Sequence, residues 1–199
     1  MAPPGRPPQK LCFVTIGATA SFNTLVSACF EQPFLDALSS AGYTDLLIQY
    51  GAEGRRIFDV FTMEVRVNAR TQLNIEGFDF NAKGLAAEMR AVKGEGGREE
   101  GVVISHAGSG SILDALRLGV PLIVVPNPEL LDNHQVELAE ALAEQGYVVH
   151  GSLDDLPTAL ARSQTLRERQ KQWPPVNSGQ HRQARGLAGV MDEEMGFLD

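Results

Sequence analysis

Small and hydrogen-bonding side chains gather at three places in this 199-residue chain, each shortly after an apolar run. They form a first loop at residues 17–21 (GATAS), a second loop at residues 106–111 (HAGSGS) and a third segment at residues 132–135 (DNHQ). If the apolar runs are parallel strands, their carboxyl ends share one edge of the sheet, where open α/β sheets bind ligands. The pattern therefore predicts one polar site built from three separate segments.

The second loop has the residue types that suit an anion. Gly108 and Gly110 let the backbone approach a ligand closely, and Ser109 and Ser111 fall where a helix N-terminus would present free N–H groups. His106 can donate a hydrogen bond to a phosphate oxygen. The alternative is a core histidine, which the neighbouring glycines and serines at a strand end disfavour.

Two acidic positions have both a functional and a structural interpretation. Asp114, in the first turns of the following helix, can accept hydrogen bonds from ribose hydroxyls or complement the helix dipole. Asp132 can cap a helix, but the four adjacent polar side chains of the third segment also suit a polyhydroxylated sugar ring. Asn127, in the adjoining loop, either contributes to that site or forms a turn with Pro128.

The first loop contacts a phosphate or forms an ordinary strand-to-helix turn. It lacks the later glycines of the dinucleotide fingerprint, and the second apolar run ends in Gln49-Tyr50 instead of an acid, so NAD binding is disfavoured. The sequence contains no P-loop, no G-x-S-x-G elbow, no H-E-x-x-H and no D-x-D metal motif. We expect no cofactor and no metal, and a chemistry of positioning and electrostatic stabilisation of a leaving phosphate.

Composition narrows the class of protein. The formal net charge of −8 disfavours nucleic-acid binding, and 43% hydrophobic with 21% charged residues is typical of a soluble globular domain. No apolar run approaches the roughly 20 residues that span a bilayer, and the start of the chain lacks a hydrophobic signal region. Cys12 and Cys29 lie in apolar contexts without metal-ligand spacing, which predicts buried free thiols and a reducing compartment.

The apolar runs alternate with helical patterns, which predicts an α/β fold: a Rossmann-like parallel sheet with helices on both faces. Residues 22–40 have helical spacing that Pro33 interrupts. Residues 53–70 are ambiguous between helix and strand, and residues 93–101 are predicted to be a surface loop. Four of the six expected strands are at residues 11–16, 45–50, 72–77 and 147–150. The other two lie within residues 102–126, one before the second loop and one that ends in Pro126.

Three regions are expected along the chain. Residues 1–10 are proline-rich and predicted to be a disordered leader, and residues 11–172 are expected to form the Rossmann-like domain that carries the polar site. Residues 173–199 form a tail with an amphipathic helix that covers this protein's own core or docks on a partner. The apolar stripe of that helix consists of Leu187, Val190, Met191, Met195 and Leu198.

As an ordered set, these motifs resemble a known family. The run VISHAGSGSILDALRLGVPLIVVPN…LLDNHQ, with GAT after the first strand, LIQYG at 47–51 and IEGFDF at 75–80, resembles the C-terminal, donor-binding half of glycosyltransferase family 28. The resemblance covers about residues 11–163. Within the family, the chain looks like the donor-binding subunit of the two-subunit UDP-N-acetylglucosamine (UDP-GlcNAc) transferase of asparagine-linked glycosylation.

The resemblance implies one half of an inverting, metal-independent GT-B enzyme. Such an enzyme adds the second GlcNAc to GlcNAc-pyrophosphate-dolichol in N-glycan precursor synthesis. The chain would be cytoplasmic and recruited to the cytosolic face of the endoplasmic reticulum by a membrane-anchored partner subunit, forming a heterodimer that is active only when complete. The alternatives are a non-catalytic nucleotide-sugar-binding module, and an epimerase or hydrolase that turns over UDP-GlcNAc alone.

The resemblance also implies roles for residues. The first loop (through Gly17, Thr19 and Ser21) and the second loop would approach the pyrophosphate. Asp114 stands where related bacterial enzymes carry a ribose-binding glutamate, and the third segment (Asp132, Asn133, His134, Gln135) would hold the GlcNAc hydroxyls. His106 is the candidate catalytic residue of this chain, and the alternative is a general base on the partner.

Overall fold

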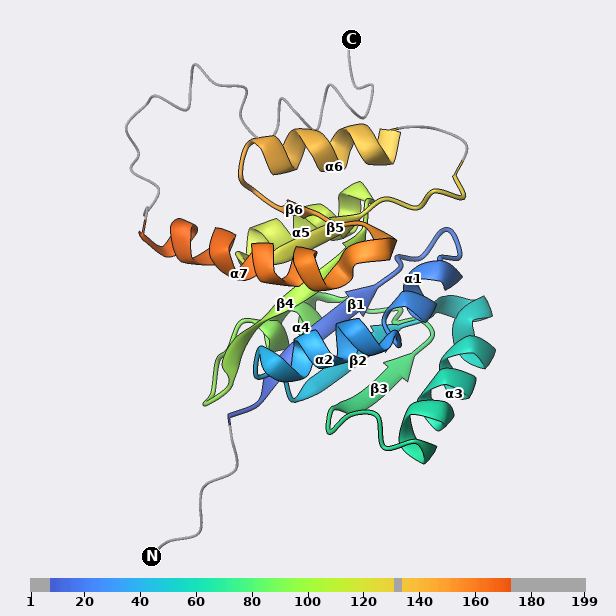
Figure 1. Ribbon diagram of the computed structural model, residues 1–199. Coiled ribbons are helices and arrows are strands. Elements are labelled where there is room, and N and C mark those ends of the chain that lie inside the picture. The colour runs from blue at the N-terminus through green and yellow to red at the C-terminus, as the bar shows by residue number, and fades with distance from the viewer. Residues whose placement is uncertain (1–7, 131–133, 173–199) are drawn as a thin grey trace, which may run out of the picture.

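The computed structural model describes residues 8–130 and 134–172. Within these ranges, strands and helices alternate along almost the whole chain (Figure 1). Their bounds are β1 Lys10–Thr15, α1 Asn23–Ala28, α2 Gln32–Ser40, β2 Asp45–Gln49, α3 Gly51–Val67, β3 Asn74–Phe78, α4 Ala86–Val92, β4 Glu99–His106, α5 Ser109–Leu118, β5 Leu122–Val125, α6 His134–Glu144, β6 Val149–His150 and α7 Leu156–Gln172.

The strands form one six-stranded sheet in the order β3-β2-β1-β4-β5-β6. Every neighbouring pair is parallel, so the predicted Rossmann-like fold is confirmed. The strand order reverses between β1 and β4, which makes the gap between the loops that follow these strands the topological switch point. The first loop follows β1 and the second loop begins at the end of β4, so both flank this switch point.

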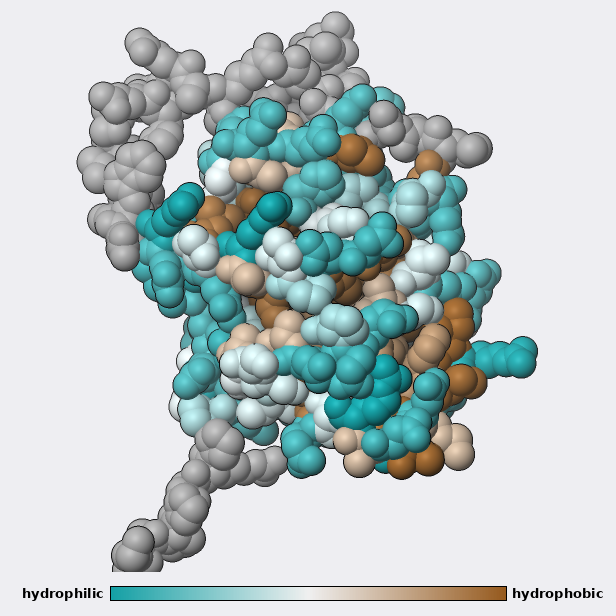
Figure 2. Space-filling view, viewed as in Figure 1, coloured by the Kyte–Doolittle hydropathy of each residue, from teal (hydrophilic) through white to brown (hydrophobic). Residues whose placement is uncertain are grey.

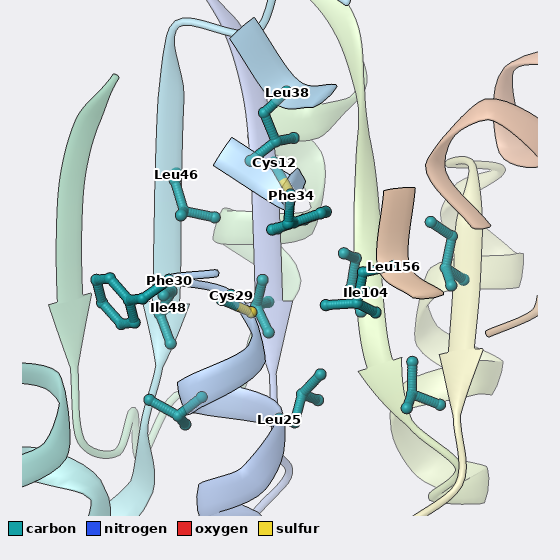
Figure 3. Packing of buried hydrophobic residues seen from close by; sticks show 14 of the residues in the cluster. Cys12, Leu25, Cys29, Phe30, Phe34, Leu38, Leu46, Ile48, Ile104 and Leu156 are labelled. Carbon is teal, nitrogen blue, oxygen red and sulfur yellow. The ribbon is translucent and has the colours of Figure 1, made fainter. Parts of the chain in front are cut away.

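Two apolar layers enclose the sheet. Side chains of one strand face, among them Cys12, Val14 and Ile104, pack against α1, α2, α3 and α7. Those of the other face, among them Phe13 and Val103, pack against α4, α5 and α6. Figure 3 shows the first layer from close by. Because both faces are covered, the central strands are continuous apolar runs in the sequence, which is why the strands were readable from it.

Pro33 divides the segment 22–40 into two helices. It occupies the first turn of α2, where its missing N–H would have no helical partner in any case. The ambiguous stretch after Glu53 belongs to α3, a single helix. Its strand-like alternation arises because Val65 is buried while Met63 and Val67 are exposed, as opposite faces of a helix require. Figure 2 shows the resulting apolar surface over α3, at the lower right of the view.

Several boundaries differ from the expectations. The predicted loop at 93–101 ends early, because β4 already begins at Glu99. The last described helix, α7, continues to Gln172. Cys12 and Cys29 are free and buried, as predicted. The proposed helix within residues 173–199 and residues 1–7 of the leader lie outside the described residues, and no described helix is long and apolar enough to cross a membrane.

Candidate functional site

The first loop, the second loop and the segment that follows β5 meet at the carboxyl edge of the sheet. β4 pairs with β1 on one side and with β5 on the other, so the loops that follow these strands are neighbours. In Figure 1, the loop after β1 and the segment after β5 lie side by side at the right of the sheet. Residues 131–133 lie outside the described residues, and with them Asp132 and Asn133 of the third segment.

The imidazole of His106 joins the first loop to the second. A Cβ atom placed on Gly17 would lie 2.3 Å from His106 Cε1, and one placed on Gly108 would lie 2.0 Å from His106 Nε2. Only glycine leaves room for the ring at both positions. Gly17 also has a φ of +77°, which glycine adopts without strain. The histidine thus fills the space between two loops, where the sequence suggested little packing around it.

Burial decides the charge of this histidine. Desolvation lowers the pKa of His106, and a hydrogen bond with the backbone of Thr15 opposes the shift without cancelling it. The ring is therefore neutral at pH 7 and donates through one nitrogen only. Its Nδ1 atom is enclosed and has no hydrogen-bond partner among the described residues. The neutral ring brings no positive charge, and its single N–H can serve either the Thr15 backbone or a phosphate, not both.

The start of α5 is open to an anion. Gly108, the residue before the helix, has an extended conformation and no side chain to cap it. The first helical hydrogen bond runs from the Ile112 amide to the Gly108 carbonyl, so the amides of residues 109–111 have no acceptor within the helix. Free N–H groups and the positive end of the helix dipole make such a terminus attractive to phosphate.

Asn127 ties the first loop to the segment after β5. Its side chain is buried, and Nδ2 donates to the Ser21 carbonyl oxygen at 3.1 Å while Oδ1 accepts from the Glu129 amide at 3.0 Å. The Asn127 amide donates to Gln135 Oε1 at 2.9 Å. Both side-chain polar atoms are thus engaged within the protein. This geometry makes Asn127 a link between loops, and its direct contact with a ligand stays a prediction.

A hollow lies between the first loop and the start of α3. Residues 16–21 and 50–53 line it. The Ser21 hydroxyl donates to Glu53 Oε2 across its rim. Nothing near Glu53 in the chain marks it as part of a polar cluster, so the sequence alone does not identify it as a site residue.

The other predicted residues lie on exposed surfaces. Asp114 is on the outside of α5, 3.6 Å from the Arg117 guanidinium, and His134 at the start of α6 lies 3.7 Å from Glu137. Neither forms a hydrogen bond with the first or second loop, and Thr19 is exposed at the tip of the first loop. Among the described residues, no cluster of three or more side chains has the ligand types and spacing for a metal ion.

A buried polar layer underlies the loops. Thr15, Gln49 and Ser105 occupy matching positions on β1, β2 and β4, and all three are buried. These three residues were not among the predicted site residues. Their position could have marked them, since each is a polar residue at the end of an otherwise apolar run.

Comparison with known proteins identifies the same family that the sequence motifs resemble. Residues 11–184 match the model of the glycosyltransferase family 28 C-terminal domain. The chain is 35% identical over 162 residues to the UDP-N-acetylglucosamine transferase subunit ALG13 of Saccharomyces cerevisiae, covering 70% of this chain and 76% of that protein. The protein of the same name from Eremothecium gossypii is 36% identical over 184 residues, covering 84% of this chain and 87% of its own.

Solved structures agree with the observed fold. An NMR solution structure of ALG13 matches with a TM-score of 0.62 at 30% identity, covering 94% of this chain and 95% of that one. The crystal structure of MurG from Acinetobacter baumannii matches with a TM-score of 0.52 at 20% identity, covering 82% of this chain but only 42% of MurG. The latter likeness concerns the fold alone.

Proposed function

The chain belongs to the glycosyltransferase family 28 C-terminal domain family, and from that membership we propose that it is the catalytic, donor-binding subunit of a UDP-GlcNAc transferase. The names of its relatives support the donor and the status as a subunit. The meeting of the first loop, the second loop and the segment after β5 at one sheet edge carries the proposal in structural terms. His106 packs against both glycine-containing loops there, and Asn127 links the first loop to the segment after β5.

The proposed reaction is a direct displacement at the anomeric carbon. The acceptor hydroxyl oxygen forms a bond to C1 of GlcNAc, the bond from C1 to the β-phosphate oxygen breaks, and UDP leaves with the electron pair. Negative charge then grows on the β-phosphate, and the free amides at the start of α5 stabilise it. A general base takes the proton of the acceptor hydroxyl. Because His106 is wedged between two loops, it suits phosphate contact better than this task, and we place the base on the partner.

A partner is required by this proposal. The chain corresponds in fold to less than half of MurG, so a second half must complete an enzyme of that architecture. We propose a membrane-anchored subunit that holds GlcNAc-pyrophosphate-dolichol at the cytosolic face of the endoplasmic reticulum and recruits this chain from the cytoplasm. The product would carry the second GlcNAc of the N-glycan precursor.

The test is reconstitution of the two subunits with UDP-GlcNAc and a lipid-linked GlcNAc-pyrophosphate acceptor. Chain extension by the pair, and none by this chain alone, is the expected result. Binding of UDP-GlcNAc by the chain without extension by the pair would instead favour the non-catalytic nucleotide-sugar-binding module. Turnover of UDP-GlcNAc by the isolated chain would favour an epimerase or hydrolase. UDP-glucose and GDP-mannose serve as competitors that test the sugar and the base.

His106→Ala tests whether His106 belongs to the donor site. The substitution removes the ring that fills the space between Gly17 and Gly108, and we expect a large loss of donor use by the reconstituted pair. Normal turnover by a folded His106→Ala complex would exclude His106 from the donor site.

A further inference from the structure

Thr15 and Gln49 form a buried polar pair directly beneath the first loop. They are register partners on β1 and β2, and their exposed fractions are 0% and 2%. We infer that Gln49 is a positioning residue of the donor site, which turns the peptide after Gly17 so that the Ala18 amide faces the donor phosphate. This inference rests on the proposed function and names an amide and a side chain that the sequence did not mark.

The hydrogen bonds of this pair leave no choice of orientation. The Thr15 hydroxyl accepts from the Gly17 amide at 3.1 Å and donates to Gln49 Oε1. Gln49 Nε2 then donates to the Gly17 carbonyl oxygen at 2.9 Å. Since a carbonyl oxygen only accepts, the amide nitrogen of Gln49 must face Gly17 and its oxygen must face Thr15. Both backbone polar groups of Gly17 are therefore engaged within the protein.

Because both backbone groups of Gly17 are engaged, the phosphate contact predicted for Gly17 moves to the amide of Ala18. The Gly17 amide is unavailable to a ligand because the Thr15 hydroxyl accepts from it. In a trans peptide, the carbonyl of one residue and the N–H of the next point in opposite directions. With the Gly17 carbonyl held toward the buried Gln49, the Ala18 N–H points away from the sheet interior. Ala18 lines the hollow of the first loop, and its amide has no acceptor among residues 8–130 and 134–172.

The placement of a glutamine in this position is otherwise costly. A buried side-chain amide loses its hydration and is tolerated only when its polar atoms find partners. A leucine or methionine would fill the same space on β2 without that requirement. Gln49 also occupies the strand end where dinucleotide-binding domains carry a ribose-binding acid. Here the side chain turns inward to the loop, so it serves the backbone that faces a phosphate.

The experiment is a titration of the ¹⁵N-labelled full-length chain with UDP, followed residue by residue. We expect the Ala18 amide proton to shift downfield on binding, while the Gly17 amide changes little. In Gln49→Met the shift at Ala18 should be lost and the Kd for UDP should rise about tenfold or more, as expected for a lost hydrogen bond to a charged group. The matched control is Gln170→Met on α7, which removes a glutamine that likewise donates to a glycine carbonyl, that of Gly146.

A second pair of variants separates positioning from folding. Thr15→Ser keeps the hydroxyl and should bind UDP within about twofold of the original chain, whereas Thr15→Val should weaken binding as Gln49→Met does. An unchanged Ala18 amide in the original chain at saturating UDP overturns the inference, whether or not the variants fold. Unaltered UDP binding by folded Gln49→Met also overturns it, but leaves the proposed function intact. Failure of the original chain to bind UDP, with and without its partner, refutes both.

Discussion

Gly108→Ala tests whether the imidazole of His106 lies directly against the backbone of Gly108. The added methyl group would lie 2.0 Å from His106 Nε2, a distance that no packed structure tolerates. The substitution introduces no backbone strain, because Gly108 has φ −88° and ψ 125°, which alanine adopts freely. Apart from the poorer capping of α5 by alanine, the cost must therefore come from displacement of the imidazole, and with it of the first loop against which the ring packs.

The expected magnitude follows from that clash. Inserting a methyl group into a packed site costs about 1–3 kcal/mol, and alanine is a poorer N-cap residue than glycine by roughly 0.5–1 kcal/mol. Together they lower the free energy of unfolding by about 1.5–4 kcal/mol, or roughly 3–16 °C in Tm for a domain of this size. Gly110→Ala is the matched control, since its methyl group meets nothing within 4 Å. It should stabilise the helix by about 0.4–1 kcal/mol.

Denaturant unfolding of the full chain measures both effects, and a double variant identifies their cause. In a His106→Ala background the ring is gone, so Gly108→Ala should lose most of its cost, giving a coupling of about 1–2 kcal/mol between the two positions. Equal destabilisation by Gly108→Ala with and without the ring would show that the imidazole does not lie against Gly108. The affinity for UDP should fall in the Gly108→Ala single variant, and adding Gly108→Ala to His106→Ala should lower it little further.

Three further outcomes follow from the same geometry. Asn127→Ala leaves the Ser21 carbonyl without its donor and should cost about 1–3 kcal/mol of stability, measured by denaturant unfolding, together with a weaker affinity for UDP. Burial raises the pKa of Cys29 to about 12, and raises that of Cys12 as well, so neither thiol should react with a disulfide reagent at pH 8 until the chain is unfolded. Because the pKa of His106 is lower in the folded than in the unfolded chain, the free energy of unfolding should fall as pH drops below about 6.5, and His106→Gln should flatten this dependence.

The strands and the edge on which the site lies were predictable because their causes are local. A strand covered on both faces is apolar at nearly every position, as Cys12, Phe13 and Val14 show. Parallel strands place their carboxyl ends together, so polar residues after each run had to converge. The α3 region was ambiguous for an equally local reason. Val65 faces the core between the exposed Met63 and Val67, and over so few residues this pattern fits a strand as well as a helix.

The connections within the site could not be predicted, because each depends on residues that only the fold brings together. No pattern within the first loop indicates that Gly17 must be glycine to admit the ring of His106. The bond from Asn127 to Ser21 spans 106 positions in the chain, and the sequence suggested a sugar contact for a side chain that links two loops. Gln49 was noticed only as the absence of an acid, since the carbonyl that it holds belongs to Gly17, in the loop that follows another strand.

The charge of the site sets a limit on what this chain does alone. A pyrophosphate carries more negative charge than one helix N-terminus offsets, since the dipole of α5 is equivalent to about half an elementary charge. Neither the first loop nor the second loop contains a lysine or arginine, and burial keeps His106 neutral at pH 7. Directed amides such as those of Ala18 and Ser109 can position a diphosphate, but they cannot neutralise it. The balancing charge must come from outside these two loops, and the partner subunit of the proposed function is one candidate source of it.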